Sequence, residues 1–424
     1  MKNKKLINRQ TYLDRVLMFR DTDLIKVVTG VRRCGKSSLL ELVQSKLIAD
    51  GISEKAILYL NLESRACPVT TEDELYNYVK DRAFKGSTTY IFLDEPQRIK
   101  GWQTAVNAMR IDFDCDIYLT GSNAYLLSSE LSTYLSGRYV ETKMLPLSVS
   151  EYLDFCGLSF GESAVTIDGN GQAVLFDDIL ERYLTYGGMP AVASLTTTQE
   201  AHSAYFSGLY DAVVTRDIIN RERIKGQSKI ADATLLERIT AFLADNVGNK
   251  VSMKSVADTL TSAGQKTSNK TVALYVKALN EAFVFYQADR YDLHGKEILR
   301  TNPKEYIVDL GLRSYLGGYR FVDVGRVFEN AVYLQLLFKG WRVHVGKLYD
   351  KEVDFVAIKD GRIVYIQVTD EMMSESTRER ELKPLRSIRD SYEKVVVVRQ
   401  GRYEADIEGI KILTAKDFFL GILL

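Results

Sequence analysis

The sequence contains few cysteines and no long apolar run. Its four cysteines are widely spaced and form no Cys-x-x-Cys pair, which argues against a zinc ribbon and a disulfide framework. This usage is typical of a protein in the reducing cytoplasm. No stretch of about 18 apolar residues occurs, and no apolar segment follows the basic start of the chain. We therefore expect neither a membrane span nor a signal peptide.

The chain also lacks an excess of charge of either sign. Lys plus Arg number 56 and Asp plus Glu number 56, so the formal net charge is zero. No global field draws the molecule to nucleic acid or anionic lipid, and any basic surface must be local. Hydrophobic residues make up 46% of the 424 positions, enough to bury substantial cores, and this length predicts two to four domains.

The first third of the chain has the pattern of an α/β domain. From Leu24 to about Leu147, short apolar runs rich in β-forming residues alternate with helical stretches. From Pro146 to about Gly248 the periodicity is helical, which predicts a helical lid and connector. The strands expected in the α/β region are Leu24–Thr29, Ala56–Asn61, Thr89–Asp94, Asp116–Thr120 and Val140–Met144.

A phosphate-binding loop is predicted where the first strand ends. The residues there fit the pattern G-x-x-x-x-G-K-[ST] at every required position, and an amphipathic helix follows. The glycines let backbone N–H groups face an anion, Lys36 supplies a cation for the β- and γ-phosphates, and the Ser37 hydroxyl suits Mg²⁺. The expected nucleotide-binding residues are Gly30, Val31, Arg32, Arg33, Cys34, Gly35, Lys36, Ser37 and Ser38.

Two carboxylates follow the expected strand Thr89–Asp94. Ligands bind at the carboxyl ends of strands in open α/β sheets, so Asp94 and Glu95 are expected beside the phosphate-binding loop. Phosphoryl transfer needs a carboxylate in the Mg²⁺ shell and a group that orients the attacking water. We assign the first role to Asp94 and the second to Glu95, which with Lys36 is expected to be catalytic.

Three further polar residues are candidates with open alternatives. Ser122 and Asn123 follow the strand Asp116–Thr120, where a small polar side chain can sense the γ-phosphate or the water. A simple Gly-Ser-Asn turn is the alternative. Arg138 could stabilise charge in the transition state, in its own or a neighbouring subunit. An ordinary surface arginine is the alternative there.

Together these segments resemble the AAA+ ATPases of the STAND-like, archaeal-ATPase type, which carry a C-terminal restriction-endonuclease-like domain of unknown function. The resemblance extends over nearly the whole chain and is carried by residues 29–37, 93–102, 119–123 and 135–138. It implies a parallel five-stranded sheet in which the strand before Gly121 lies between the phosphate-loop strand and the Asp-Glu strand. The segment Gly187-Gly188-Met189-Pro190 resembles the Gly-x-Pro element of such ATPases, which implies that Pro190 lies against the nucleotide.

A winged helix is predicted after the connector, because helix, turn, helix and hairpin follow one another over residues 251–300. Residues 248–300 contain eight basic and five acidic side chains, a balance of +3 that permits DNA binding without requiring it. A protein contact or a lid element is the alternative. The second helix is expected to bury Val272, Tyr275, Val276 and Leu279. The candidate DNA contacts are Asn269, Lys270, Lys277 and Lys296.

The tail of the chain resembles the PD-(D/E)xK nuclease fold. That chemistry needs carboxylates for a metal and a lysine that assists the nucleophile. Glu329 and Asp354 are available, but Gln367 and Thr369 stand where an active member places Glu and Lys, and an amide is a poor Mg²⁺ ligand. We expect a degenerate site in a scaffolding or DNA-holding domain, with a working nuclease as the alternative. The Asp360-Gly361 pair predicts a tight hairpin that brings Asp354 near Gln367.

The expected organisation is therefore an AAA+ core (1–147), a helical lid and connector (148–247), a winged helix (248–320) and a nuclease-like α/β domain (321–424). The leading hypothesis is an ATPase that uses ATP and Mg²⁺ and couples its nucleotide state to the other domains. An ATP-switched DNA-binding regulator with negligible turnover is the alternative, against which Glu95 counts, and an ATP-regulated nuclease is a third. The expected partners are ATP or ADP and either double-stranded DNA or a protein. No membrane partner is expected, and the oligomeric state remains open.

Overall fold

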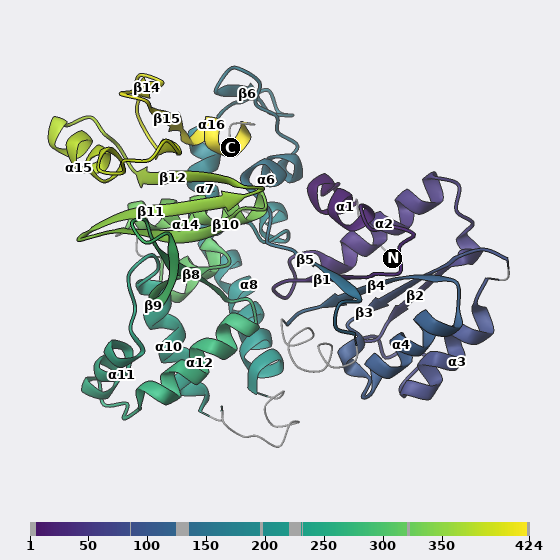
Figure 1. Ribbon diagram of the computed structural model, residues 1–424. Helices are drawn as coiled ribbons and strands as arrows, with labels where there is room; N and C mark the ends of the chain where they lie inside the picture. The colour runs from purple at the N-terminus through teal and green to yellow at the C-terminus, as the bar shows by residue number, and fades with distance from the viewer. Residues whose placement is uncertain are drawn as a thin grey trace. The chain divides into compact units, whose positions relative to one another are not determined.

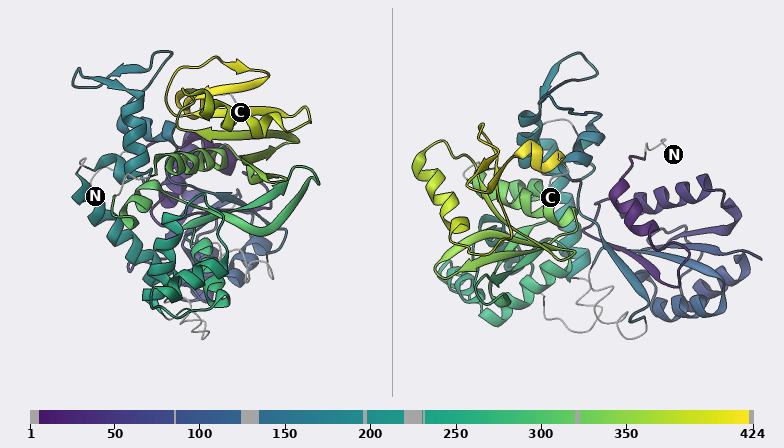
Figure 2. Two further views of the ribbon diagram at one scale, coloured as in Figure 1. Left: turned by 90° about the vertical axis from the view of Figure 1, so that its left-hand side faces the viewer. Right: turned by 45° about the horizontal axis from the view of Figure 1, so that its top comes forward.

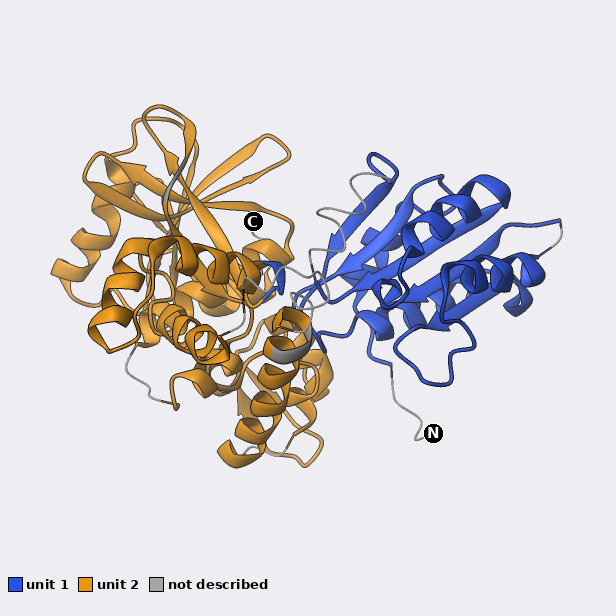
Figure 3. Ribbon diagram, turned by 90° about the horizontal axis from the view of Figure 1, so that it is seen from below, with its two compact units in different colours: residues 1–145, 281–283 blue, residues 146–280, 284–424 orange. Residues whose placement is uncertain are grey.

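The chain forms two compact units. The computed structural model describes residues 6–84, 86–123, 135–195, 198–219, 230, 232–319 and 323–421. Unit 1 comprises residues 1–145 and 281–283, and unit 2 comprises residues 146–280 and 284–424 (Figure 3). Within the described ranges, no helix is both long and apolar enough to traverse a lipid bilayer.

Unit 1 is built on a parallel five-stranded sheet with the strand order β2-β3-β4-β1-β5 (Figure 1). β4 lies between β1 and β3, which confirms the arrangement that the resemblance implies. The expected strand positions are also confirmed, with ends that differ by one residue at most. The strands are β1 (Ile25–Thr29), β2 (Ile57–Asn61), β3 (Thr89–Asp94), β4 (Cys115–Gly121) and β5 (Tyr139–Lys143).

Helices cover both faces of this sheet, as the buried strands of a parallel sheet require. Figure 1 shows α1 and α2 on one face and α3 and α4 on the other. Every residue of β1 and β3 is buried, and Trp102 and Met109 pack in one apolar cluster with Ile91 and Leu119. The helices are α1 (Gln10–Leu17), α2 (Lys36–Ala49), α3 (Glu72–Arg82) and α4 (Trp102–Asp112), with short 3₁₀ turns at Glu54–Ala56 and Pro96–Arg98.

Unit 2 contains an eight-stranded mixed sheet with the order β14-β15-β13-β12-β11-β10-β8-β9. β8 pairs in parallel with β10, so one sheet continues across residue 320, where the sequence pattern predicts a boundary. The domain boundaries remain predictions. The strands are β8 (Phe285–Asp292), β9 (Glu297–Ile307), β10 (Arg342–Leu348), β11 (Lys351–Lys359), β12 (Arg362–Thr369), β13 (Glu393–Val398), β14 (Asp406–Ile407) and β15 (Ile410–Thr414).

The remaining elements of unit 2 are mostly helical. A separate two-stranded ribbon, β6 (Val165–Ile167) with β7 (Ala173–Leu175), extends from the helices (Figure 2). A π-helix at Ala212–Ile219 and a 3₁₀ turn at Val192–Ser194 complete the described elements. The α-helices are α6 (Val149–Cys156), α7 (Phe176–Tyr186), α8 (Gln199–Asp211), α10 (Ala233–Asp245), α11 (Met253–Ser262), α12 (Asn269–Glu281), α13 (Leu310–Leu316), α14 (Val324–Phe338), α15 (Glu375–Arg386) and α16 (Ala415–Leu420).

The hairpin of β11 and β12 has the predicted tight turn. Lys359 pairs with Arg362, and the two residues between them, Asp360 and Gly361, have φ angles of 48° and 80°. This left-handed geometry at both positions is that of a type I′ turn, which Asp-Gly favours. The hairpin brings Asp354 and Gln367 together, as predicted: the backbone nitrogen of Asp354 lies 3.5 Å from Oε1 of Gln367.

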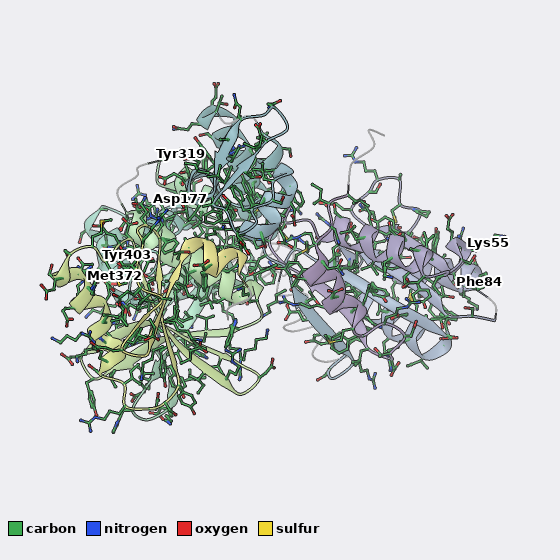
Figure 4. The ribbon with its side chains drawn as sticks, turned by 90° about the horizontal axis from the view of Figure 1, so that it is seen from above. Lys55, Phe84, Asp177, Tyr319, Met372 and Tyr403 are labelled. Atoms are coloured by element: carbon green, nitrogen blue, oxygen red, sulfur yellow. The ribbon has the colours of Figure 1, made fainter. Side chains whose placement is uncertain are left out.

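One apolar cluster of the tail lies between this sheet and α15. Val353, Val396 and Leu382 belong to one buried apolar cluster, which also contains Met372. The backbone N–H of Met372 donates to the hydroxyl of Tyr403 at 2.7 Å, and Figure 4 labels both residues. These contacts fix the segment that joins β12 to α15.

Candidate nucleotide-binding site

The loop between β1 and α2 has an alternating backbone conformation. The φ angles of Gly30, Arg33 and Gly35 are 150°, 66° and 107°. A Cβ atom on Gly30 would lie 2.1 Å from the carbonyl oxygen of Met144, so only glycine fits there. Such alternation directs successive backbone N–H groups toward one concavity, next to the positive end of α2. The loop therefore has the backbone of an anion-binding site.

Lys36 begins α2 and reaches back across this loop. Its ammonium donates to the carbonyl oxygens of Gly30 at 2.9 Å and Val31 at 3.2 Å, and the residue is buried. Ser37 follows in the first helical turn and is half-buried. A cation and a hydroxyl thus lie at the same helix terminus, as the sequence predicts.

Asp94 ends β3 at the same edge of the sheet, because β1, β3 and β4 run parallel. It is 2% exposed. The hydroxyl of Thr120, at the end of β4, donates to one carboxylate oxygen, and the hydroxyl of Tyr59 donates to the other at 3.2 Å. Burial, and secondly the charge of Asp94, raises the pKa of Tyr59, which keeps this phenol a donor.

Glu95 has a backbone that glutamate rarely adopts. Its φ is 58°, in the left-handed region. Its N–H donates to the Thr120 hydroxyl at 3.0 Å, and its carboxylate accepts from the Ser122 hydroxyl at 3.1 Å and from the amide of Gln97. Sequence reasoning missed Thr120, Tyr59 and Gln97. Of these, only Thr120 could have been identified from the sequence, because it ends a strand that is expected next to the strand of Asp94.

An ion cluster lies beside the loop. Arg32 and Arg98 both pair with Glu63, at 3.3 Å and 2.8 Å. Burial alone would raise the pKa of Glu63, but the two guanidinium groups lower it. Arg32 is thus held by a carboxylate of its own chain, which sequence reasoning did not foresee.

Asn123 and Arg138 occupy different edges of the sheet. Asn123 is buried and follows β4 at the edge that carries Asp94. Arg138 is exposed and precedes β5, and its backbone carbonyl accepts from the N–H of Ile25, at the start of β1. Its guanidinium donates to Asn107 at 3.0 Å. A strand of this length spans about 17 Å, so the structure does not bring Arg138 to the loop of its own chain. The exposed position fits the alternative of an ordinary surface arginine, and a role in a neighbouring subunit stays a prediction.

Two relatives extend over nearly the whole chain. An uncharacterized protein of Haemophilus influenzae is 39% identical over 420 residues, which cover 99% of this chain and 100% of that protein. The chain belongs to the same family as that protein. An uncharacterized protein of Methanocaldococcus jannaschii is 27% identical over 420 residues, 98% of this chain and 86% of that protein.

The chain also matches two domain families. Residues 22–153 match the family described as AAA domain, and residues 177–322 match a domain of unknown function (DUF8612). The loop, Asp94 and Glu95 thus lie in an AAA domain. Among solved structures, a Walker-type ATPase of Pyrococcus abyssi is 16% identical and covers 73% of this chain and 95% of that chain, with a TM-score of 0.47. The ORC1 protein of Aeropyrum pernix in complex with DNA is 13% identical and covers 74% of this chain and 94% of that chain, with a TM-score of 0.30.

The glycines before Pro190 have a structural explanation within unit 2. A Cβ on Gly187 would lie 2.2 Å from a carboxylate oxygen of Asp309, and the N–H of Gly188 donates to Asp309 at 2.8 Å. Burial raises the pKa of Asp309 to about 6, although backbone N–H donors oppose this. Sequence reasoning missed Asp309. A contact between Pro190 and nucleotide stays a prediction.

The predicted DNA-contacting side chains lie on exposed positions. Asn269, Lys270 and Lys277 are exposed on α12, whose four expected core residues are all buried. Lys296 is exposed in the turn between β8 and β9, and its ammonium lies 5.5 Å from the centre of the Tyr392 ring. Whether this surface contacts DNA stays a prediction.

The polar cluster of the tail contains a lysine that the sequence analysis did not identify. Lys304 of β9 is 5% exposed in its side chain and pairs with Glu329 at 3.1 Å and Glu352 at 2.9 Å. Burial alone would lower the pKa of Lys304, but Glu329, Asp354 and Glu352 raise it. Burial, and secondly Glu329, raises the pKa of Asp354 well above its usual range. In the described part of the chain, no group of His, Cys, Asp and Glu is arranged to hold a metal ion.

Thr369 and Gln367 have partners of their own beside this cluster. The hydroxyl of Thr369 donates to the backbone carbonyl of Glu371 at 3.0 Å. The amide of Gln367 donates to Glu381 at 3.1 Å. Of the four predicted residues of the degenerate site, the hairpin joins Asp354 and Gln367, and Lys304 lies against Glu329.

Proposed function

We propose that the chain is a Mg²⁺-dependent ATPase that hydrolyses ATP to ADP and phosphate in its AAA domain. The observation that supports this best is the convergence of three features at one sheet edge. These are the loop with Lys36, the carboxylate Asp94 and the carboxylate Glu95. A phosphate site alone would serve a switch, whereas a second carboxylate beside it serves hydrolysis.

The side chains at this edge suit Mg²⁺ and the phosphates. Ser37 and Asp94 offer hydroxyl and carboxylate oxygens, the donors that Mg²⁺ prefers, and two hydroxyl donors orient the Asp94 carboxylate. Mg²⁺ would neutralise charge that develops on the phosphate oxygens. Lys36 and the loop N–H groups would bind those oxygens, with the ammonium leaving the loop carbonyls that it now contacts.

Glu95 is proposed to orient and deprotonate the attacking water. A carboxylate held by Ser122 and Gln97 points in a defined direction, which a positioned base requires. Ser122 would then contact both the base and the water, and Asn123 would contact the γ-phosphate. Arg138 is proposed to act on the nucleotide of a neighbouring subunit.

Nucleotide binding tests this proposal first. Lys36→Ala removes the cation that the loop supplies, so we expect its affinity for a fluorescent ATP analogue to fall by at least about tenfold. Lys46→Ala, at the other end of α2, is the matched control and should bind as the parent does. Equal affinity of the parent and Lys36→Ala would contradict the proposal.

A DNA-binding regulator is the second candidate, and the exposed cations of α12 favour it. Such binding would be driven by phosphate contacts, so Lys270→Glu with Lys277→Glu should weaken it on unrelated sequences and reduce its salt dependence. Lys254→Glu on α11 is the matched control. Mobility shifts at two salt concentrations measure this, and absence of binding by the parent at low salt would leave the protein-contact alternative.

The tail is proposed to be a nuclease-like scaffold without activity. Gln367 and Thr369 supply neither the missing carboxylate nor the missing lysine, and the ammonium of Lys304 already pairs with Glu329 and Glu352. We expect no Mg²⁺-dependent cleavage of linear, supercoiled or single-stranded DNA. Cleavage that is lost in Asp354→Ala but kept in Lys36→Ala would place the nuclease hypothesis first.

A further inference from the structure

Arg9 connects the phosphate-binding loop to Leu145, which ends the first segment of unit 1. The residue is 3% exposed and immediately precedes α1. One guanidinium nitrogen, Nη1, donates to the carbonyl oxygen of Cys34 in the loop at 3.0 Å and to that of Leu145 at 3.1 Å. The guanidinium lies 4.7 Å from the centre of the Tyr12 ring, and the Tyr12 hydroxyl accepts from the N–H of Leu145 at 3.0 Å. Both backbone groups of Leu145 are therefore held by residues at the start of the chain.

The residue before Leu145 touches the same loop directly. The N–H of Met144 donates to the carbonyl of Thr29 at 2.7 Å. Its carbonyl oxygen lies 3.6 Å from Sγ of Cys34 and fills the space that a Cβ of Gly30 would need. Close-packed groups of this kind do not deform independently. A movement of the loop at Gly30 or Cys34 must therefore displace Met144 or Leu145.

The chain is anchored again two residues further on, inside unit 2. The N–H of Leu147 donates to the carbonyl of Gly188 at 2.7 Å, and the Tyr183 hydroxyl donates to the carbonyl of Leu147 at 2.8 Å. Only Pro146 separates the residue held in unit 1 from the residue held in unit 2. Because only one residue lies between these two positions, we expect a displacement of Leu145 to change the position of Leu147.

We propose that Arg9 is a positioning residue that transmits the nucleotide state of the loop to the linker 144–147. This inference rests on the proposed ATP site. We expect phosphate binding to reorient the peptide groups of the loop, including that of Cys34. Nη1 is buried and donates to the carbonyl oxygens of both Cys34 and Leu145. A change in one of these hydrogen bonds therefore alters the other. The hydrogen bond that Arg9 donates to the loop goes to the backbone carbonyl of Cys34, so we assign Arg9 a role in coupling and not in the chemistry.

Backbone hydrogen exchange of the linker amides tests this inference. In the full chain, a non-hydrolysable ATP analogue with Mg²⁺ should change the exchange rates of the Leu145 and Leu147 amides by about fivefold or more. Arg9→Met keeps the apolar stem and removes both hydrogen bonds. It should bind the analogue but lose the linker response. Arg9→Lys should restore part of the response, because an ammonium can still donate to a carbonyl. Arg15→Met removes another guanidinium that lies over the Tyr12 ring and is the matched control.

The outcomes separate this inference from the proposed function. Binding of the analogue by the parent without any change in the linker amides would overturn the inference alone. A full response in Arg9→Met would do the same. If the parent bound no nucleotide, the proposed function would fall and the inference with it.

Discussion

Thr120 is predicted to hold the Asp94 carboxylate and the Glu95 backbone in position relative to each other. It is fully buried, and its hydroxyl donates to Asp94 while it accepts from the N–H of Glu95 at 3.0 Å. Thr120→Val keeps the shape and removes the hydroxyl. It deletes a hydrogen bond to a charged group, worth about 1.5–3 kcal/mol, and leaves the N–H of Glu95 without that acceptor. If the lost free energy stabilises the transition state and not bound ATP, kcat should decrease by about 10- to 150-fold.

Phosphate release at saturating ATP, measured as a function of Mg²⁺ concentration, checks this prediction. Because Asp94 is the proposed metal ligand, Thr120→Val should also need more Mg²⁺ for half-maximal rate. Thr120→Ser retains the hydroxyl and should stay near the parental rate, which separates loss of the hydrogen bonds from loss of packing. A folded Thr120→Val protein with parental kcat and parental Mg²⁺ requirement would refute the reasoning.

Three further predictions concern stability. Burial raises the pKa of Glu305 from 4.5 to about 8, so its favourable contribution to the free energy of unfolding is complete below pH 4.5 and is lost as the pH rises to about 8. The free energy of unfolding in urea should therefore fall less between pH 5 and 9 for Glu305→Gln than for the parent. An equal fall in the two proteins would contradict the assignment. Lys304→Met removes the cation that Glu329 pairs with and leaves Glu352 with Lys250. This change should cost about 3 kcal/mol in urea unfolding, with Lys296→Met as the exposed control. A cost equal to the control's would mean that the ion pairs of Lys304 add nothing to stability. Gly188→Ala would place a Cβ 2.4 Å from the carbonyl of Leu147 and should lower the thermal midpoint relative to Gly325→Ala, where the added Cβ has open space; equal midpoints would count against tight packing there.

The features predicted well from the sequence are local in the chain. The loop of Gly30 to Ser37 and the strand that ends at Asp94 combine short motifs with apolar runs, and local patterns of this kind determine strands and turns. The Asp360-Gly361 turn is likewise set by two adjacent residues with positive φ. The position of Arg138 could also have been deduced. It precedes a strand that was expected to be parallel, and the start of such a strand lies opposite the phosphate-binding edge.

The features that were missed depend on contacts between distant residues. Arg9 meets Leu145 across 136 positions of sequence, and Lys304 meets Glu352 between two separate strands. No spacing rule relates such positions. The parallel pairing of β8 with β10 was missed for the same reason, because a hairpin pattern determines pairing within the hairpin and says nothing about its outer edges.

The measurement that tests the central claim most directly compares ATP turnover and ATP retention in Glu95→Gln. The amide keeps the size of the side chain but cannot take a proton from water. We expect Glu95→Gln to bind ATP with an affinity near the parent's and to release phosphate at least about 100-fold more slowly. Glu54 is an exposed glutamate of the same unit, so Glu54→Gln should behave as the parent does. Phosphate release by Glu95→Gln at the parental rate would contradict the assignment of Glu95 as the water-positioning base.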